Sequence, residues 1–160
     1  MRLVSSLAIG LLLLSACSKH KHAKHPKEAE PEAPLSEGSR CIDRARTPRK
    51  PPIDAPERMD LGQILVRHAG VRDSKGATRT REEACLRAEE AREKLLAGGD
   101  WDSVFGEYSD AQGASQGVLY DVTQGSLEPA FADAAFSLKV DELSYVVETK
   151  RGFHIIWRKK

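Results

Sequence analysis

The pattern of hydrophobic and polar positions becomes regular after Met59 and predicts strands and helices from there to the C-terminus. The run 61–67 is short and rich in β-branched and aliphatic residues, which favours a strand. Thr80 and Glu83 have the spacing of a capping box, in which a helix begins just after the threonine. Apolar residues then recur at helical spacing along one face: Ala84, Ala88, Ala91 and Leu95. Segment 80–98 is therefore expected to be a helix that buries this stripe.

The rest of the chain predicts two more helices and three more strands. Asp100 is a suitable N-cap for a helix over 101–108. A third helix is expected over 128–136, where Pro129 is tolerated in the first turn. The expected strands are 118–122, 145–149 and 153–157. The order β-α-α-β-α-β-β predicts one α+β domain over 59–160, built on a small, mostly antiparallel sheet.

The N-terminus has a different pattern, typical of a secretory signal peptide over residues 1–16. Arg2 is the only charged residue before Lys19, and the run 7–14 is almost entirely apolar. A helix that spans a bilayer needs about 20 apolar residues, so this run is too short to be one. The first sixteen residues are therefore expected to direct export and then to be removed.

The end of this segment, Leu14-Ser15-Ala16-Cys17, resembles the lipobox of bacterial lipoproteins. The resemblance implies cleavage before Cys17 and lipid attachment to its thiol, which would make the membrane a partner of the protein. Ser18, in place of an aspartate, implies by the same resemblance an outer-membrane anchor facing the periplasm. The alternative is an ordinary signal peptide followed by an incidental cysteine.

Residues 17–58 are expected to form a disordered linker between the lipid anchor and the domain. Seven of the eight prolines lie between positions 26 and 56, and large apolar side chains are scarce. Such a composition buries too little surface to offset the entropy of ordering. The His/Lys run 19–25 is either a metal-binding stretch or a solvated basic stretch near anionic lipid. Cys41 lies in this linker, and pairing with Cys85 outside the cytosol is left open.

Charge and composition exclude some classes of partner. The chain has 25 basic and 24 acidic residues, a formal net charge of +1. Proteins that bind nucleic acids usually have a strongly basic domain, so no nucleic-acid partner is expected. The sequence also predicts no cofactor and no metal ion within the domain.

Several motifs of the C-terminal domain, in their order along the chain, resemble those of the parvulin-type peptidyl-prolyl isomerases, also called rotamase or PpiC-like domains. The resemblance covers residues 61–158. Its motifs are Ile64-Leu65-Val66-Arg67-His68, Tyr108-Ser109-Asp110, Gly125-Ser126-Leu127-Glu128-Pro129-Ala130-Phe131 and Gly152-Phe153-His154-Ile155-Ile156. It implies a four-stranded, mostly antiparallel sheet wrapped by helices, with a groove that seats a proline of an unfolded or exported polypeptide.

The resemblance also implies the polar half of an active site. His154 matches the second of the family's two central histidines, and Thr149 matches a hydroxyl beside it. Gln63 stands where the family usually has its first histidine, and we expect it to hydrogen-bond His154. Ala111 stands where a cysteine or an aspartate is frequent. The alternative for His154 is a core histidine whose hydrogen bonds are satisfied, and Thr149 is equally a choice for strand propensity.

The apolar half of the implied site consists of Leu119, Leu127 and Phe131, which match the proline-pocket positions of the family. Their alternative is plain core packing. Arg67 lies in the region where some parvulins place basic residues that bind a phosphorylated substrate. The function implied is isomerisation of X–Pro bonds to assist the folding of exported envelope proteins. The alternative is a weakly active or inactive chaperone-like module that binds peptides.

Overall fold

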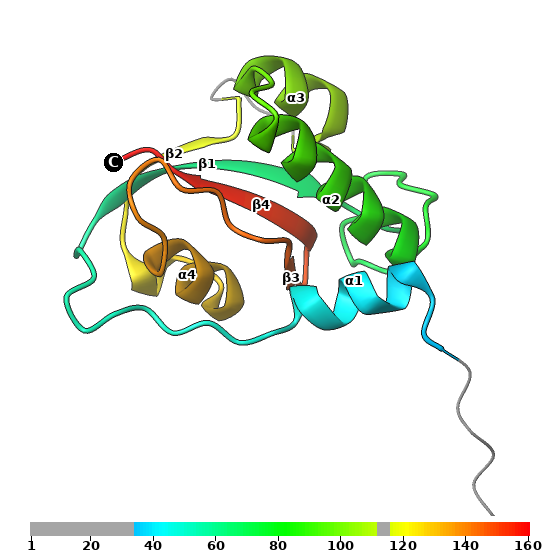
Figure 1. Ribbon diagram of the computed structural model, residues 1–160, viewed down its shortest axis with the longest axis horizontal. Helices are drawn as coiled ribbons and strands as arrows, with labels where there is room; N and C mark the ends of the chain where they lie inside the picture. The colour runs from blue at the N-terminus through cyan, green and yellow to red at the C-terminus, as the bar shows by residue number, and fades with distance from the viewer. Residues whose placement is uncertain (1–33, 112–115) are drawn as a thin grey trace, which may run out of the picture. The chain divides into compact units, whose positions relative to one another are not determined.

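The fold is built on a four-stranded antiparallel sheet in the order β2-β1-β4-β3 (Figure 1). The strands are β1 (Met59–Val66), β2 (Val118–Val122), β3 (Val147–Thr149) and β4 (Gly152–Arg158). The helices are α1 (Glu37–Ala45), α2 (Arg81–Leu96), α3 (Trp101–Tyr108) and α4 (Pro129–Phe136), with a short 3-10 turn at Gln124–Ser126. The computed structural model describes residues 34–111 and 116–160, and Pro34–Lys160 form one unit.

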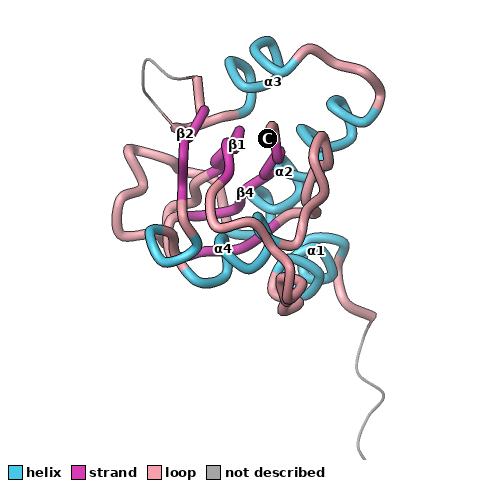
Figure 2. The backbone as a smooth tube through the Cα atoms, turned by 90° about the vertical axis from the view of Figure 1, so that its left-hand side faces the viewer, coloured by secondary structure: helices cyan, strands magenta, loops and turns pink. Residues whose placement is uncertain are grey.

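Helices cover both faces of this sheet because side chains alternate between the faces along each strand. Ile64 and Ile155 point to one face and pack against α1, α2 and α3. Leu61 and Ile156 point to the other face and pack against α4. In a view at right angles to the first, α3 and α4 lie on opposite sides of the sheet (Figure 2). The predicted order β-α-α-β-α-β-β is confirmed for residues 59–160.

The helix starts follow the local signals in the sequence. The Thr80 hydroxyl accepts a hydrogen bond from the Glu83 amide, and the Glu83 carboxylate accepts one from the Thr80 amide, so the capping box is formed. The Asp100 carboxylate accepts a hydrogen bond from the Ser103 amide at 2.9 Å and caps α3. Pro129 occupies the first turn of α4, where its missing N–H has no helical partner to lose.

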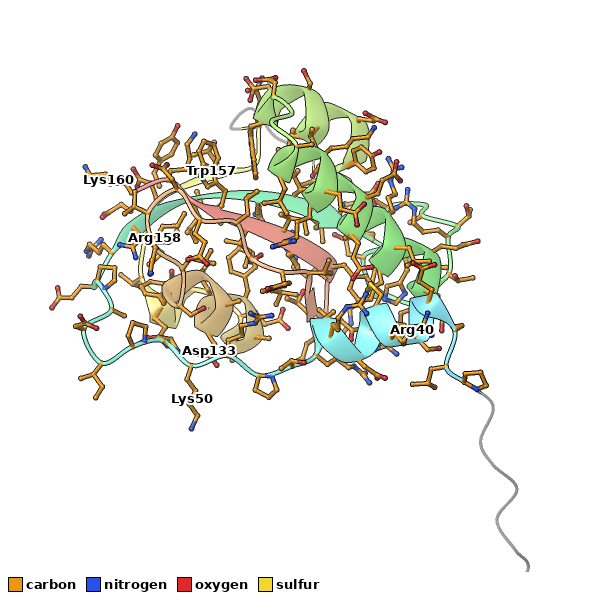
Figure 3. The ribbon with its side chains drawn as sticks, viewed as in Figure 1. Arg40, Lys50, Asp133, Trp157, Arg158 and Lys160 are labelled. Atoms are coloured by element: carbon orange, nitrogen blue, oxygen red, sulfur yellow. A yellow bond between two sulfur atoms is a disulfide. The ribbon has the colours of Figure 1, made fainter. Side chains whose placement is uncertain are left out.

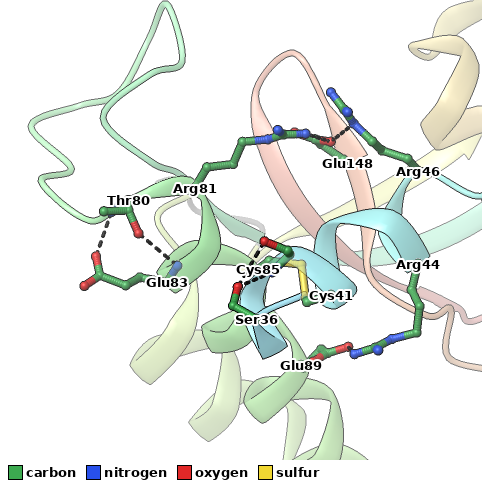
Figure 4. The surroundings of a disulfide bond; sticks show 11 residues. Ser36, Cys41, Arg44, Arg46, Thr80, Arg81, Glu83, Cys85, Glu89 and Glu148 are labelled. Atoms are coloured by element: carbon green, nitrogen blue, oxygen red, sulfur yellow. Dashed lines mark hydrogen bonds and ion pairs between the residues drawn. A yellow bond between two sulfur atoms is a disulfide. The ribbon is translucent and has the colours of Figure 1, made fainter. Parts of the chain in front are cut away.

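The prediction of a disordered linker over 17–58 is wrong for its second half. Residues Glu37–Ala45 form helix α1, whose buried face consists of Gly38, Cys41, Ile42 and Ala45. Cys41 is bonded to Cys85 of α2, and both cysteines are fully buried (Figure 4). Low average hydrophobicity concealed this helix, because four residues on a single face and one covalent bond are enough to hold it against α2. The compact unit Pro34–Lys160 therefore includes residues 34–58, which the prediction had assigned to the linker.

The segment 46–58 runs from α1 past α4 to the start of β1 (Figure 1). Within it, Ala55 packs against the core beneath α4. The predicted signal peptide, Cys17 and the His/Lys run lie outside the described residues. Among the helices of residues 34–111 and 116–160, none combines the length and the hydropathy that crossing a bilayer requires.

Candidate active site

A pocket of about 200 Å³ opens where β1, β2, the start of α4 and the β3–β4 hairpin meet. The sequence predicts seven residues for catalysis and substrate binding. Six of them line this pocket: Gln63, Leu119, Leu127, Phe131, Thr149 and His154. Residues far apart in sequence therefore converge here, as the family resemblance implied. Arg67 is the exception.

Strand register explains why Gln63 and His154 share this pocket. In the β1–β4 pair, Gln63 lies opposite Ile156, and Leu65 lies opposite His154. Residues opposite each other in an antiparallel pair point to the same face, and so do residues two positions apart on one strand. Gln63 and His154 are therefore diagonal neighbours on the face that α4 covers.

A tight hairpin places Thr149 beside His154. Thr149 pairs with Gly152 across the turn, and its hydroxyl oxygen lies 2.9 Å from His154 Nε2. The same hydroxyl accepts a hydrogen bond from the Arg151 amide at 3.0 Å. Gly152 has a φ of 134°, and a Cβ there would lie 2.4 Å from the Val66 carbonyl oxygen. This turn therefore requires glycine.

His154 is uncharged in the folded protein. Its side chain is almost completely buried, and that burial, reinforced by the positive charges of Arg151 and Arg67, lowers its pKa from 6.5 to about 3. Its Nδ1 has no hydrogen-bond partner, although it is buried. The Phe131 ring and the imidazole form a T-shaped contact, with 5.1 Å between the ring centroids. His154 thus links the Thr149 hydroxyl to the wall of the pocket.

The hydrogen bond expected between Gln63 and His154 is absent among the described residues. Gln63 is half-buried and lines the pocket, but His154 Nδ1 keeps no partner. Ala111 does not line the pocket, and its amide donates to the Ser109 hydroxyl. The polar half of the implied site is therefore reduced to the Thr149–His154 pair and the Gln63 amide.

Phe131 serves both as core and as pocket lining. It is only 4% exposed and belongs to the core beneath α4, yet it also lines the pocket. Leu119 and Leu127 are partly buried and pack against the same core. The two interpretations offered by the sequence, core packing and pocket lining, are therefore compatible for these residues.

Arg67 lies outside the pocket and is 4% exposed. Its guanidinium donates a hydrogen bond to the Asp110 carbonyl oxygen, and its amide donates to the Asp110 carboxylate. Arg79 pairs with the same carboxylate. These contacts hold the start of the loop after α3 against the end of β1. Such burial argues against the substrate-binding role that the sequence predicted for Arg67.

Comparison with known proteins agrees with this geometry. A family model described as "Rotamase: PPIC-type PPIASE domain" matches residues 64–160. The chain belongs to the PpiC-type peptidyl-prolyl isomerases. It is 38% identical over 113 residues to the "Putative peptidyl-prolyl cis-trans isomerase dodo" of Drosophila melanogaster, covering 66% of this chain and 68% of that protein. It is 34% identical over 97 residues to the "Foldase protein PrsA" of Bacillus subtilis, covering 59% of this chain and 30% of PrsA.

Solved structures of isomerases share the fold. The peptidyl-prolyl isomerase ESS1 from Candida albicans has a TM-score of 0.61 and 27% identity, and the match covers 69% of this chain and 67% of that one. PrsA from Bacillus subtilis has a TM-score of 0.51 and 29% identity, covering 65% of this chain and 35% of that one. The predicted parvulin fold is confirmed, and residues 64–160 form a parvulin-type isomerase domain. Helix α1 precedes residues 64–160, which the family model matches.

Isomerisation by a PpiC-type enzyme requires few polar groups. Rotation about an X–Pro bond faces a barrier of about 18–20 kcal/mol, which arises from amide resonance. The twisted amide loses that resonance and becomes less polar, so an apolar pocket stabilises it relative to the planar ground state. An uncharged His154 keeps the pocket free of a buried positive charge. Within the described residues, no group of His, Cys, Asp and Glu side chains is placed to hold a metal ion.

An ion-pair network fixes the strand that carries Thr149. Arg81 binds the Glu148 carboxylate through two hydrogen bonds of 2.6 Å, and Arg46 adds a third at 2.7 Å (Figure 4). Burial alone would raise the pKa of Glu148, but the hydrogen bonds from Arg81 and Arg46 and their charges outweigh it and lower the pKa below its usual 4.5. The isomerase thus attaches β3 to both α1 and α2.

Sequence reasoning missed three residues that line the isomerase pocket: Ser126, Glu128 and Arg151. The Glu128 carboxylate accepts a hydrogen bond from the Lys150 amide at 3.0 Å, which joins the start of α4 to the hairpin. Arg151 is exposed in the same hairpin. The sequence did contain a signal for two of them, since Glu128 immediately precedes Pro129 at a helix start and Arg151 lies in the hairpin turn. Only the fold shows that they line the pocket.

Proposed function

We propose that this isomerase works outside the cytosol, held at the membrane by lipid on Cys17, and assists the folding of exported envelope proteins. The observation that carries the location is the disulfide between Cys41 and Cys85. Disulfides persist in oxidising compartments and are rare in the cytosol. The pattern of residues 1–17 supports the same location independently.

The lipid anchor suits a folding assistant at a membrane surface. Several acyl chains on one N-terminal cysteine hold a protein stably, whereas a single chain holds it marginally. Sixteen residues, 18–33, separate Cys17 from the folded unit that begins at Pro34. The family includes proteins named foldases, such as PrsA, and an outer-membrane anchor facing the periplasm would place the pocket where exported chains fold.

The substrate proposed is an unfolded polypeptide that contains proline. Its proline ring enters the pocket between Leu119, Leu127 and Phe131, because these are the apolar residues that line it. The Thr149–His154 pair then lies beside the X–Pro bond. Binding favours the twisted amide over the planar amide, which is the only requirement for accelerating its rotation.

Replacement of the lipidated cysteine tests the anchor. Cys17→Ser is expected to abolish lipid attachment and to release a folded protein into the soluble fraction of the envelope. Metabolic labelling with a radioactive fatty acid, followed by fractionation, measures both effects. Ser18→Ala is the matched control and should stay labelled and membrane-bound. Labelling that persists in Cys17→Ser would overturn the proposal of a lipid anchor.

A second candidate function, a holder of unfolded peptides with slow turnover, is favoured by one observation. The Gln63 amide does not reach His154, and His154 Nδ1 is left without a partner. The polar side chains of the pocket are therefore held less tightly than two histidines that hydrogen-bond each other. Peptide binding depends mainly on the apolar residues and is expected to persist.

Gln63→His distinguishes the two candidates. A histidine ring at position 63 is expected to give His154 Nδ1 a partner and to raise kcat on a proline peptide. Isomerisation is followed by NMR exchange, and the melting temperature should move by only a few degrees, about 1 kcal/mol for a domain of this size. Gln63→Leu is the control that fills similar space without a hydrogen bond. If the wild type and Gln63→His both bind proline peptides without turnover, the protein is a holder.

A further inference from the structure

A second, larger depression adjoins the proline pocket, on the far side of Glu128 and Thr149. We call it the flanking groove. Its volume is about 520 Å³, against about 200 Å³ for the proline pocket. Glu128 and Thr149 line both depressions, so the two adjoin at these residues. A chain that leaves the proline pocket across this boundary enters the flanking groove.

Three parts of the fold form the flanking groove. One wall is the segment 45–49, which follows α1. The opposite wall is the outer side of α4, with Ala130 and Asp133. In Figure 3, Asp133 lies on the side of α4 nearest the segment that carries Lys50. The third part is β3, the edge strand of the sheet.

The wall formed by 45–49 is held in place at several points. The disulfide at Cys41 fixes α1 to α2, and Arg46 binds the Glu148 carboxylate of β3 at 2.7 Å. The Arg49 guanidinium lies 4.8 Å from the centre of the Tyr145 ring, within the range of a cation–π contact. This wall lies before residue 64, outside the residues that the family model matches.

The lining of the flanking groove matches an extended polypeptide. Its charged residues are of both signs, with Asp133 on α4 and with Arg46 and Arg49 on the segment 45–49. The main chain of a polypeptide has a hydrogen-bond donor and an acceptor at each residue except proline. A lining of mixed charge therefore suits the main chain and favours neither acidic nor basic substrates. The edge strand β3 pairs with β4 on one side only, and an edge strand is a template for a further extended segment.

We propose that the flanking groove binds the stretch of substrate polypeptide next to the proline, in extended form alongside β3. This inference rests on the proposed function, since the occupant is the same unfolded chain whose proline enters the pocket. It predicts that the protein distinguishes substrates by length. A long unfolded chain fills both depressions, whereas a short peptide fills only the proline pocket.

Filling the groove without touching the proline pocket tests this inference. Ala130 is exposed and lines only the groove, so Ala130→Trp is expected to block it and leave the fold intact. For a reduced, unfolded protein whose refolding is limited by proline isomerisation, kcat/KM should fall about tenfold, the equivalent of about 1.4 kcal/mol. For a short Ala-Pro peptide, kcat/KM should not change. Ala97→Trp, at an exposed alanine at the end of α2, is the matched control.

The outcomes separate this inference from the activity itself. Undiminished kcat/KM on the long substrate would overturn the groove proposal, and so would equal losses on long and short substrates. If the wild type turns over neither substrate, calorimetric binding of the two by wild type and Ala130→Trp gives the same comparison. A selective loss of long-chain binding then supports the groove even where isomerisation fails. Ala130→Arg is a second blocking variant should the tryptophan impair folding.

Discussion

The buried, uncharged state of His154 predicts how the stability of the protein depends on pH. The perturbation is a shift from neutral to mildly acidic buffer, compared between the wild type and His154→Gln. Glutamine carries an amide to about the position of Nε2, where it can keep the contact with the Thr149 hydroxyl, but it does not titrate. Any difference in acid sensitivity between the two proteins therefore reports the ionisation of His154.

The sign follows from the direction of the pKa shift. The pKa of His154 is lowered to about 3 in the folded protein, whereas the unfolded chain has the usual 6.5. Between these values the unfolded state binds more protons, so stability falls as the pH falls from 6.5 towards 3. Below pH 6.5 the free energy of unfolding falls by about 1.4 kcal/mol for each pH unit. At about pH 5 the loss is therefore about 2 kcal/mol.

The assay is urea unfolding of both proteins at about pH 7 and about pH 5. The chain without residues 1–17 retains the whole unit Pro34–Lys160, and reductant is omitted to keep the disulfide. The free energy of unfolding of the wild type should fall by about 2 kcal/mol more than that of His154→Gln. His68, whose pKa is also lowered by burial, is present in both proteins and cancels in the comparison. The lowered pKa of Glu148 changes the pH dependence of stability only below the usual value of 4.5.

Equal losses of stability in the two proteins would refute the reasoning. That result would mean that His154 titrates near its ordinary pKa in the folded state and accepts a positive charge inside the pocket. The accompanying expectation for activity is a kcat that does not vary through ionisation of His154 between about pH 5 and pH 8, because the ring is neutral over that range.

Two further predictions follow from the fold and the site. Replacing Cys41 and Cys85 by alanine should lower the free energy of unfolding by about 4 kcal/mol, because the bond closes a loop with a sequence separation of 44. Urea unfolding against the oxidised wild type measures this loss. An unchanged stability would show that α1 holds its place without the bond. Phe131→Ala should cost about 3–5 kcal/mol, as for a fully buried ring, and a cost well below this range would contradict its place in the core.

The sequence by itself determined the elements of the isomerase domain, because the rules that form them are local. The capping box at Thr80, the N-cap at Asp100 and the proline at the start of α4 each act within one helical turn. Helical and strand periodicities identified which faces are buried. The family resemblance identified six residues that the structure gathers around one pocket.

The tertiary structure alone decided features that depend on contacts distant in sequence. Composition made residues 34–58 look like a linker, but a disulfide and a single buried helix face order α1 against α2. Arg67 looked available to a substrate, but it is buried, hydrogen-bonded to Asp110 and not part of the pocket lining.

The same limit applies to the hydrogen bonds of the site and to the flanking groove. The family resemblance placed Gln63 near His154, yet only the packed side chains show that His154 Nδ1 keeps no partner. The flanking groove exists because the segment after α1 returns alongside α4 and β3. Local propensity fixes which residues form helices and strands, whereas burial, cross-links and the path of the chain between elements fix what each side chain can reach.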